Sequence, residues 1–214
     1  AAAELDALRA ACADAVGCLL ASDPEVVVCV GDGPEMRRYD ESAGGTMHAF
    51  GVDTRTAGRS ADLPLALTVG EWLLDRAGWD GPRRYIALSL ETTSEECVRI
   101  GATTAAADLR VGVLALGDGS AKRSEQAPGY LDERAEPFDA EVAAALGRAD
   151  LRWLSEQPPP LACAELWVAG RQAWQFLAGA ATQTPQGDTL AARMHYDAAP
   201  YGVGYLVASW VARS

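Results

Sequence analysis

Short apolar runs alternate along this chain with longer segments in which apolar residues recur at helical spacing. Three runs are apolar and rich in branched residues, at 26–30, 85–90 and 111–116. Runs of this kind, bounded by turn residues, are typical of strands buried on both faces of a sheet. The helical spacing predicts helices over 3–21, 64–77, 94–108, 138–146 and 161–181. Two further strands are predicted at 193–196 and 204–211, joined by a short connection at 199–202.

The alternation of strands and helices predicts the fold class. It indicates an α/β fold with a mainly parallel central sheet and helices on both faces. The 214 residues suit one domain spanning 1–214, and neither a linker nor an internal repeat is visible. Residues 35–63 are polar and rich in glycine, so we expect a long loop with short strands there.

Composition and charge limit the kinds of partner that the protein is expected to bind. The formal net charge is −12, which argues against a nucleic-acid partner and against an anionic membrane surface. No stretch approaches the ~18 uninterrupted apolar residues of a membrane span. The five cysteines are irregularly spaced and form no C-x-x-C pair, so we expect reduced, buried thiols rather than a metal ribbon. These features predict a cytoplasmic protein.

The same tripeptide, Gly-Asp-Gly, follows two of the predicted strands, at 31–33 and at 117–119. In open α/β sheets, ligands bind at the carboxyl ends of the strands, and glycine lets the backbone approach a ligand closely. Basic residues follow each loop, including Arg37 and Lys122. One crevice is therefore expected to hold two carboxylates and several cations, although Gly-Asp-Gly is also favourable turn chemistry. The predicted ligand-binding residues are Gly31, Gly33, Arg37, Gly117, Gly119 and Ser120.

The familiar catalytic motifs are missing. The sequence contains no G-x-G-x-x-G, P-loop, G-x-S-x-G or H-E-x-x-H pattern. Only two histidines occur, His48 and His195, which excludes a site built from several histidines of this sequence. The tryptophans Trp153, Trp167 and Trp174 lie on helical patterns and are predicted to belong to the core or its edge.

A family resemblance rests on the later part of the chain. The stretch 116–123, continued by 127–130 and 137–139, resembles the signature loop of the class III extradiol ring-cleavage dioxygenases and their Memo-like relatives. The segment 199–205 resembles the final strand region of that family. The resemblance implies an α/β fold, and it also implies a first strand that would precede residue 1.

The resemblance implies a chemistry that this sequence only partly retains. Active members hold Fe(II) through two histidines and a glutamate, and a further histidine serves as acid and base. The first metal histidine belongs to the region before residue 1, and the second corresponds to Asp32. The acid/base histidine corresponds to Ala121 and the metal glutamate to Val168, with Glu165 one helical turn earlier. The first hypothesis is therefore a member without ring-cleaving activity that binds a small molecule or a protein partner in the crevice.

Two alternatives remain open at this stage. The second hypothesis is a metal-dependent oxidoreductase in which Asp32, Glu165 and His48 hold Fe(II) or another divalent ion, while Asp118 or Lys122 handles protons. The third is an anion site formed by the two glycine loops with Arg37, Lys122 and Arg123. The family resemblance also implies assembly, either as a homo-oligomer or with a second subunit.

Overall fold

The computed structural model describes residues 5–53, 56, 58–59, 62–107, 109–185 and 189–213. The predicted helix positions 3, 4 and 108 lie outside these residues. The helices are α1 (Asp6–Ala21), α2 (Leu65–Arg76), α3 (Ser94–Ala105), α4 (Ala135–Arg148), α5 (Leu151–Glu156), α6 (Pro160–Leu166) and α7 (Arg171–Ala181). The strands are β1 (Val26–Asp32), β2 (Arg37–Tyr39), β3 (Arg83–Leu88), β4 (Val111–Ala115), β5 (Thr189–Ala198) and β6 (Tyr205–Arg213).

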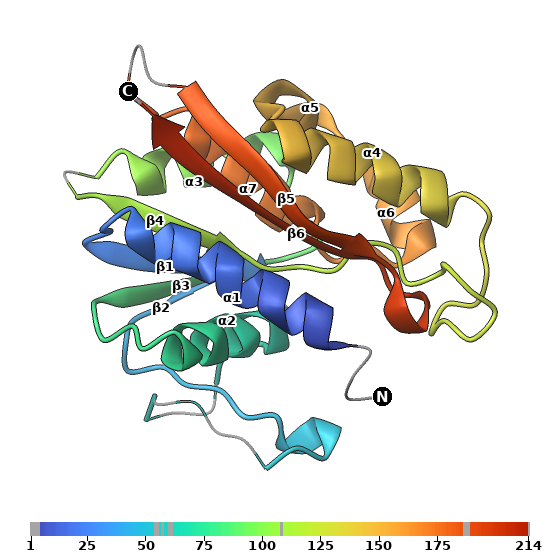
Figure 1. Cartoon of the computed structure of the whole chain (residues 1–214), viewed down its shortest axis with the longest axis horizontal. Helices are drawn as coiled ribbons and strands as arrows, with labels where there is room; N and C mark the ends of the chain where they lie inside the picture. Colours follow the sequence, from blue (N-terminus) through green and yellow to red (C-terminus); the bar gives the residue numbers. More distant parts are fainter. Residues whose placement is uncertain are drawn as a thin grey trace.

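Two sheets organise the described residues (Figure 1). The larger has the order β2-β3-β1-β4, in which β1 pairs in parallel with both β3 and β4. The short strand β2 adds antiparallel to β3 at one edge. The second sheet is the antiparallel hairpin β5–β6. A mainly parallel central sheet is thus confirmed.

Alternate residues of β1 point to opposite faces of the sheet. Val27 and Cys29 pack in the apolar cluster that includes Val16 of α1 and Leu67 of α2. Val28 and Val30 pack in the cluster that includes Cys97 and Ile100 of α3 and Ala173 and Phe176 of α7, all of them buried. Both faces are therefore covered by helices, which explains why β1 is apolar throughout rather than alternating.

The helices α3 and α7 approach each other closely through two glycines. A Cβ atom on Gly101 of α3 would lie 2.0 Å from the carbonyl oxygen of Phe176. A Cβ atom on Gly179 of α7 would lie 2.1 Å from the carbonyl oxygen of Val98. Because neither position has room for a methyl group, the two helices pack backbone against backbone.

A third apolar cluster lies under the hairpin. It joins residues of α4 to α7, including Leu146, Leu154 and Trp174, to Met194 and Trp210 of the hairpin. The indole nitrogen of Trp210 donates a hydrogen bond of 2.7 Å to the carbonyl oxygen of Leu146. This cluster holds the hairpin against α4 to α7, and α1 contacts both the hairpin and β4 (Figure 1).

The predicted helix 161–181 is wrong as one unit. It is two helices, α6 and α7, separated where Trp167 takes a left-handed conformation with φ 57°. Trp167 is also 57% exposed, so its predicted place in the core or at its edge is wrong, whereas Trp174 is buried. The short helix α5 and strand β2 were not predicted individually. The helix α6 is closed there by the N–H of Val168, which donates to the carbonyl oxygen of Cys163 at 2.8 Å.

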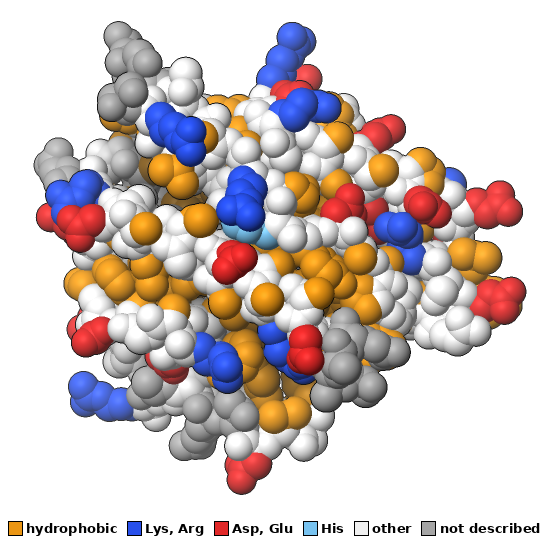
Figure 2. Space-filling model, viewed as in Figure 1, with side chains coloured by type: hydrophobic (Ala, Val, Ile, Leu, Met, Phe, Trp, Pro, Cys, Tyr) orange, Lys and Arg blue, Asp and Glu red, His pale blue; other side chains and the backbone are white. Residues whose placement is uncertain are grey.

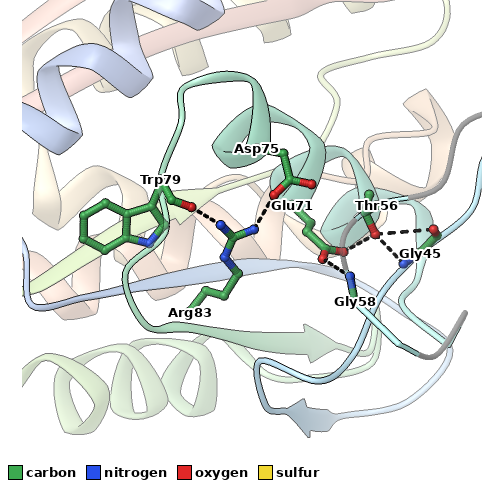
Figure 3. A network of polar contacts seen from close by, with 7 residues as sticks. All are labelled: Gly45, Thr56, Gly58, Glu71, Asp75, Trp79 and Arg83. Carbon is green, nitrogen blue, oxygen red and sulfur yellow. Dashed lines mark hydrogen bonds and ion pairs between the residues drawn. The ribbon is translucent and has the colours of Figure 1, made fainter.

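The long loop before α2 is anchored by a buried acid (Figure 3). Glu71 of α2 is only 1% exposed, and its two carboxylate oxygens accept hydrogen bonds from the Thr56 hydroxyl and from the backbone N–H of Gly58, the latter at 3.0 Å. The Thr56 hydroxyl oxygen in turn accepts the N–H of Gly45 at 2.8 Å. A single side chain thus ties two separate parts of the loop to α2.

Glu71 gives this anchor a pH dependence. Burial is the main cause that raises the pKa of Glu71 above its ordinary value of 4.5, while the hydrogen bonds from Thr56 and Gly58 act in the opposite direction. The folded state therefore binds this proton more tightly than the unfolded chain, so the protein loses stability as the pH rises from 4.5 through the folded pKa. A Glu71→Gln variant removes this loss.

We therefore expect the stability of Glu71→Gln, relative to the parent protein, to improve as the pH rises through that window. Urea unfolding at a series of pH values measures the difference. A difference that is independent of pH, or one that shifts in favour of the parent protein, would contradict the assignment.

Candidate functional site

A cavity of about 510 Å³ opens at the carboxyl ends of β1 and β4. Its walls come from α1, α2, the end of β4 and the start of β6, and they are mostly apolar. The polar residues that line it include Asp32, Asp118 and Tyr205. Apolar pockets with a few convergent polar groups are the usual form of small-molecule sites.

Adjacent parallel strands bring the two carboxylates together. Asp32 ends β1, and Asp118 follows its neighbour β4. The backbone carbonyl of Asp118 accepts hydrogen bonds from the N–H groups of Ala169 and Gly170, at 3.2 and 3.0 Å. These bonds fix the loop after β4 to the segment between α6 and α7. Asp32 and Asp118 therefore line the same cavity, as the sequence predicts for the two carboxylates.

The environment of the pair disfavours two negative charges. Burial raises the pKa of Asp32. Asp118 is accessible at the cavity mouth, yet the protein packed around it raises its pKa, and the charge of Asp32 raises it further. Burial also raises the pKa of Tyr205, with Asp118 contributing to the shift. A cation placed between the carboxylates would relieve this unfavourable charge.

The loop after Asp118 is held by a second, buried carboxylate. Asp139 of α4 is fully buried and accepts the backbone N–H of Ser120 at 2.8 Å and the Ser120 hydroxyl at 2.7 Å. Arg123 donates to the same carboxylate at 3.2 Å. The hydroxyl of Ser120 is therefore engaged by Asp139 in the fold. Sequence reasoning missed Asp139 as a site-positioning residue, although it lies in the stretch that carries the family resemblance.

The four predicted glycines contact protein rather than open space. A Cβ atom on Gly31 would lie 2.7 Å from the Ala66 side chain, and one on Gly33 would lie 2.8 Å from Ala87. The corresponding distances are 2.4 Å from Gly117 to the Cα of Gly170 and 2.8 Å from Gly119 to the carbonyl oxygen of Gly204. These glycines allow close packing around the cavity.

The basic side chains that were predicted to share the crevice make contacts outside the cavity. The guanidinium of Arg37 lies 4.9 Å from the ring centre of Tyr39 on β2. The ammonium of Lys122 lies 5.5 Å from the ring centre of the exposed Trp167. Arg123 pairs with Asp139. Since none of these three lines the cavity, the structure separates the predicted cations from the two carboxylates.

The three predicted metal ligands do not meet. Glu165 forms an ion pair of 2.6 Å with Arg134, and His48 lies 2.6 Å from the Asp53 carboxylate on an exposed turn. Asp32 alone of the three reaches the cavity. Over the part of the chain that the structure describes, no group of three or more His, Cys, Asp or Glu residues is arranged to hold a metal ion.

Comparisons with known proteins leave the site to be interpreted from its geometry. Neither the protein-family models nor the curated protein sequences gave a match to this chain. Within the described ranges, no helix has the length and apolar character needed to cross a membrane. On the face seen in Figure 2, the described Lys and Arg side chains are interspersed with Asp and Glu and form no basic stripe.

Proposed function

We propose that this protein binds a small organic cation, with an ammonium group seated between Asp32 and Asp118 and an apolar part in the adjoining cavity. The pairing of two carboxylates in an otherwise apolar cavity carries this proposal. No described Lys, Arg or His side chain lines that cavity to neutralise them. An ammonium ion supplies the missing charge and up to three hydrogen-bond donors.

The residues present do not fit the iron centre that the family resemblance implies. Ala121 stands at the acid/base position and has no group that transfers a proton. Val168 stands at the position of a metal ligand, while the substitute Glu165 is engaged by Arg134 outside the cavity. These departures support a binding role rather than ring cleavage, and the rearranged metal site with Asp32, Glu165 and His48 gains no support from the geometry.

The proposed binding depends on pH in a definite direction. Ammonium binding requires ionised carboxylates, and the pKa values of Asp32 and Asp118 are both raised above their ordinary value of 3.8. Affinity is therefore expected to increase as the pH rises above 3.8 through the folded pKa values, and then to level off while the amine stays protonated.

The test compares two ligands that differ in charge. Phenethylamine is expected to bind and to raise the unfolding temperature at neutral pH, whereas 2-phenylethanol, of similar shape, is not. Asp118→Asn is expected to weaken phenethylamine binding about tenfold or more, since hydrogen bonds to charged groups contribute roughly 1.5–3 kcal/mol. Calorimetric titration measures both affinities, and Glu141→Gln on the exposed side of α4 is the matched control. Equal binding of the amine and the alcohol, or an unchanged affinity in Asp118→Asn, would refute the proposal.

A further inference from the structure

A hollow of about 220 Å³ lies at one side of the larger sheet, between β2, β3 and the end of α3. Its lining includes Arg38 of β2, Arg84 of β3, and Thr103 and Thr104 of α3. Arg84 is near the start of β3, whereas the amine cavity opens at the carboxyl ends of β1 and β4, which are parallel to β3 in the sheet. The two sites therefore lie toward opposite ends of the sheet, and no described residue lines both.

Strand pairing places the two arginines on the same face of the sheet. Arg38 lies opposite Ile86 in the antiparallel pair of β2 and β3, and Arg84 lies two residues before Ile86 on β3. Side chains two residues apart on a strand share a face, and so do directly opposed residues. Ile86 packs in the apolar cluster of α3, so this is the face that α3 covers. Diagonal neighbours on adjacent strands are about 7–8 Å apart, so two positive side chains lie close together.

Neither arginine has a counter-ion in the described part of the chain. Arg38 and Arg84 make no hydrogen bond or ion pair with another side chain there, whereas Arg83, Arg110 and Arg123 each pair with an acid. The chain as a whole has a net charge of −12, so acids are in excess and yet are not placed against these two side chains. Two neighbouring like charges repel each other, and an anion between them would relieve that repulsion.

The groups nearest to the hollow do not cancel its positive charge. Asp40 follows β2, but its carboxylate accepts the backbone N–H and the hydroxyl of Ser42, at 2.8 and 2.5 Å, and it does not line the hollow. The last turn of α3 does border the hollow, and a helix C-terminus carries about half a negative charge. Half a charge is less than the two positive charges of the guanidiniums, so an anion is still favoured.

We propose that this hollow binds a small phosphate monoester through the guanidiniums of Arg38 and Arg84. Two guanidiniums match a dianion, and a phosphate monoester carries a charge of about −1.5 to −2 at pH 7. The planar guanidinium can donate two parallel N–H bonds to phosphate oxygens. The hollow is smaller than the ~300–1,000 Å³ of drug-sized sites, so the organic part of the ester is expected to be small and to lie against Ala107 at the end of α3. This site is independent of the proposed amine site.

The experiment titrates phenyl phosphate into the whole chain at low ionic strength and follows binding by calorimetry and by backbone amide chemical shifts. We expect a dissociation constant of about 1 mM or lower. The largest shifts are expected at residues 38–39, 84–86 and 103–107, which line the hollow. Phenol, which lacks the phosphate, is expected to cause none of these shifts. Raising the salt concentration to ~0.5 M is expected to weaken binding, because it screens exposed charges.

Arg37 provides the matched control on the same strand. Its guanidinium lies 4.9 Å from the ring centre of Tyr39, and it does not line the hollow. Arg38→Gln and Arg84→Gln are each expected to weaken phenyl phosphate binding about tenfold or more, since each removes charged hydrogen bonds to the phosphate. Arg37→Gln removes the same charge and is expected to weaken binding less than about twofold. Arg84→Lys, which keeps the charge and loses the planar fork, is expected to be intermediate. Arg37, Arg38 and Arg84 are exposed, so the variants are expected to fold normally.

Three outcomes would overturn the proposal. One is no binding of phenyl phosphate at concentrations up to ~10 mM. Another is an equal loss of affinity in Arg37→Gln, which would indicate a general effect of net charge. The third is a set of chemical shifts centred away from the hollow. A protein that binds phenethylamine but not phenyl phosphate would refute this proposal alone, and the reverse result would refute only the amine site.

Discussion

Asp139→Ala is expected to lower the free energy of unfolding by about 3–5 kcal/mol, the range found when one partner of a buried ion pair is removed. The carboxylate is fully buried and accepts hydrogen bonds from the backbone and hydroxyl of Ser120 and from Arg123. Its loss leaves these donors buried without an acceptor, and it frees the loop that carries Asp118. Urea unfolding monitored by tryptophan fluorescence measures the change.

The matched control is the other acid that pairs with Arg123. Glu136 lies 3.6 Å from the Arg123 guanidinium, but its side chain is 79% exposed. Because exposed ion pairs contribute little, Glu136→Ala is expected to change stability by about 0–1 kcal/mol. If Asp139→Ala were as mild as this control, Asp139 would not be the residue that holds the loop in place.

Gly101→Ala is expected to cost about 3 kcal/mol or more, at or above the usual range for overpacking. The added methyl group would sit 2.0 Å from the Phe176 carbonyl oxygen, and this obstacle is backbone, which has little room to move. The helices α3 and α7 must separate to admit it, which opens the apolar cluster on that face of the sheet. Thermal and urea unfolding measure the loss.

Gly17→Ala provides the opposite expectation with the same chemical change. Gly17 lies on the exposed side of α1, and a Cβ atom there would meet nothing within 4 Å. Alanine is favoured over glycine inside a helix by about 0.8–1.0 kcal/mol, so this variant is expected to gain stability. A Gly101→Ala protein as stable as the parent would show that α3 and α7 do not pack through their backbones.

The central sheet could be predicted from the sequence because its signal is local. The run 26–30 is apolar at every position, and the structure buries all of it, at 0 or 1% exposure, between two helical layers. The break between α6 and α7 could not be predicted in this way. Trp167 takes its left-handed conformation where Ala169 and Gly170 bond to Asp118, about fifty residues away in sequence. The helical spacing of apolar residues in the sequence does not indicate that long-range contact.

In the candidate site, too, some features could be predicted from the sequence and others depend on contacts between distant residues. Asp32 and Asp118 could be placed together because the carboxyl ends of adjacent parallel strands meet at one edge of the sheet. The contacts of the Lys122 and Arg123 side chains could not be predicted, because their partners Trp167 and Asp139 come from other parts of the chain. In the sequence, Asp139 looks no different from Glu136 and Glu141, the other acids of the same helix. Only its contact with Ser120 reveals that it supports the cavity wall.

The hydrogen bonds between the Asp118 loop and the start of β6 also set an order of events during synthesis. Gly119 donates to the carbonyl of Gly204, and Gly204 donates to the carbonyl of Ser120, at 2.9 and 2.8 Å. Residues 202–206 leave the ribosome long after the first sheet strands have been made, and domains complete their packing as units. The acidic pair therefore lacks this part of its cavity wall until residues 202–206 have been made.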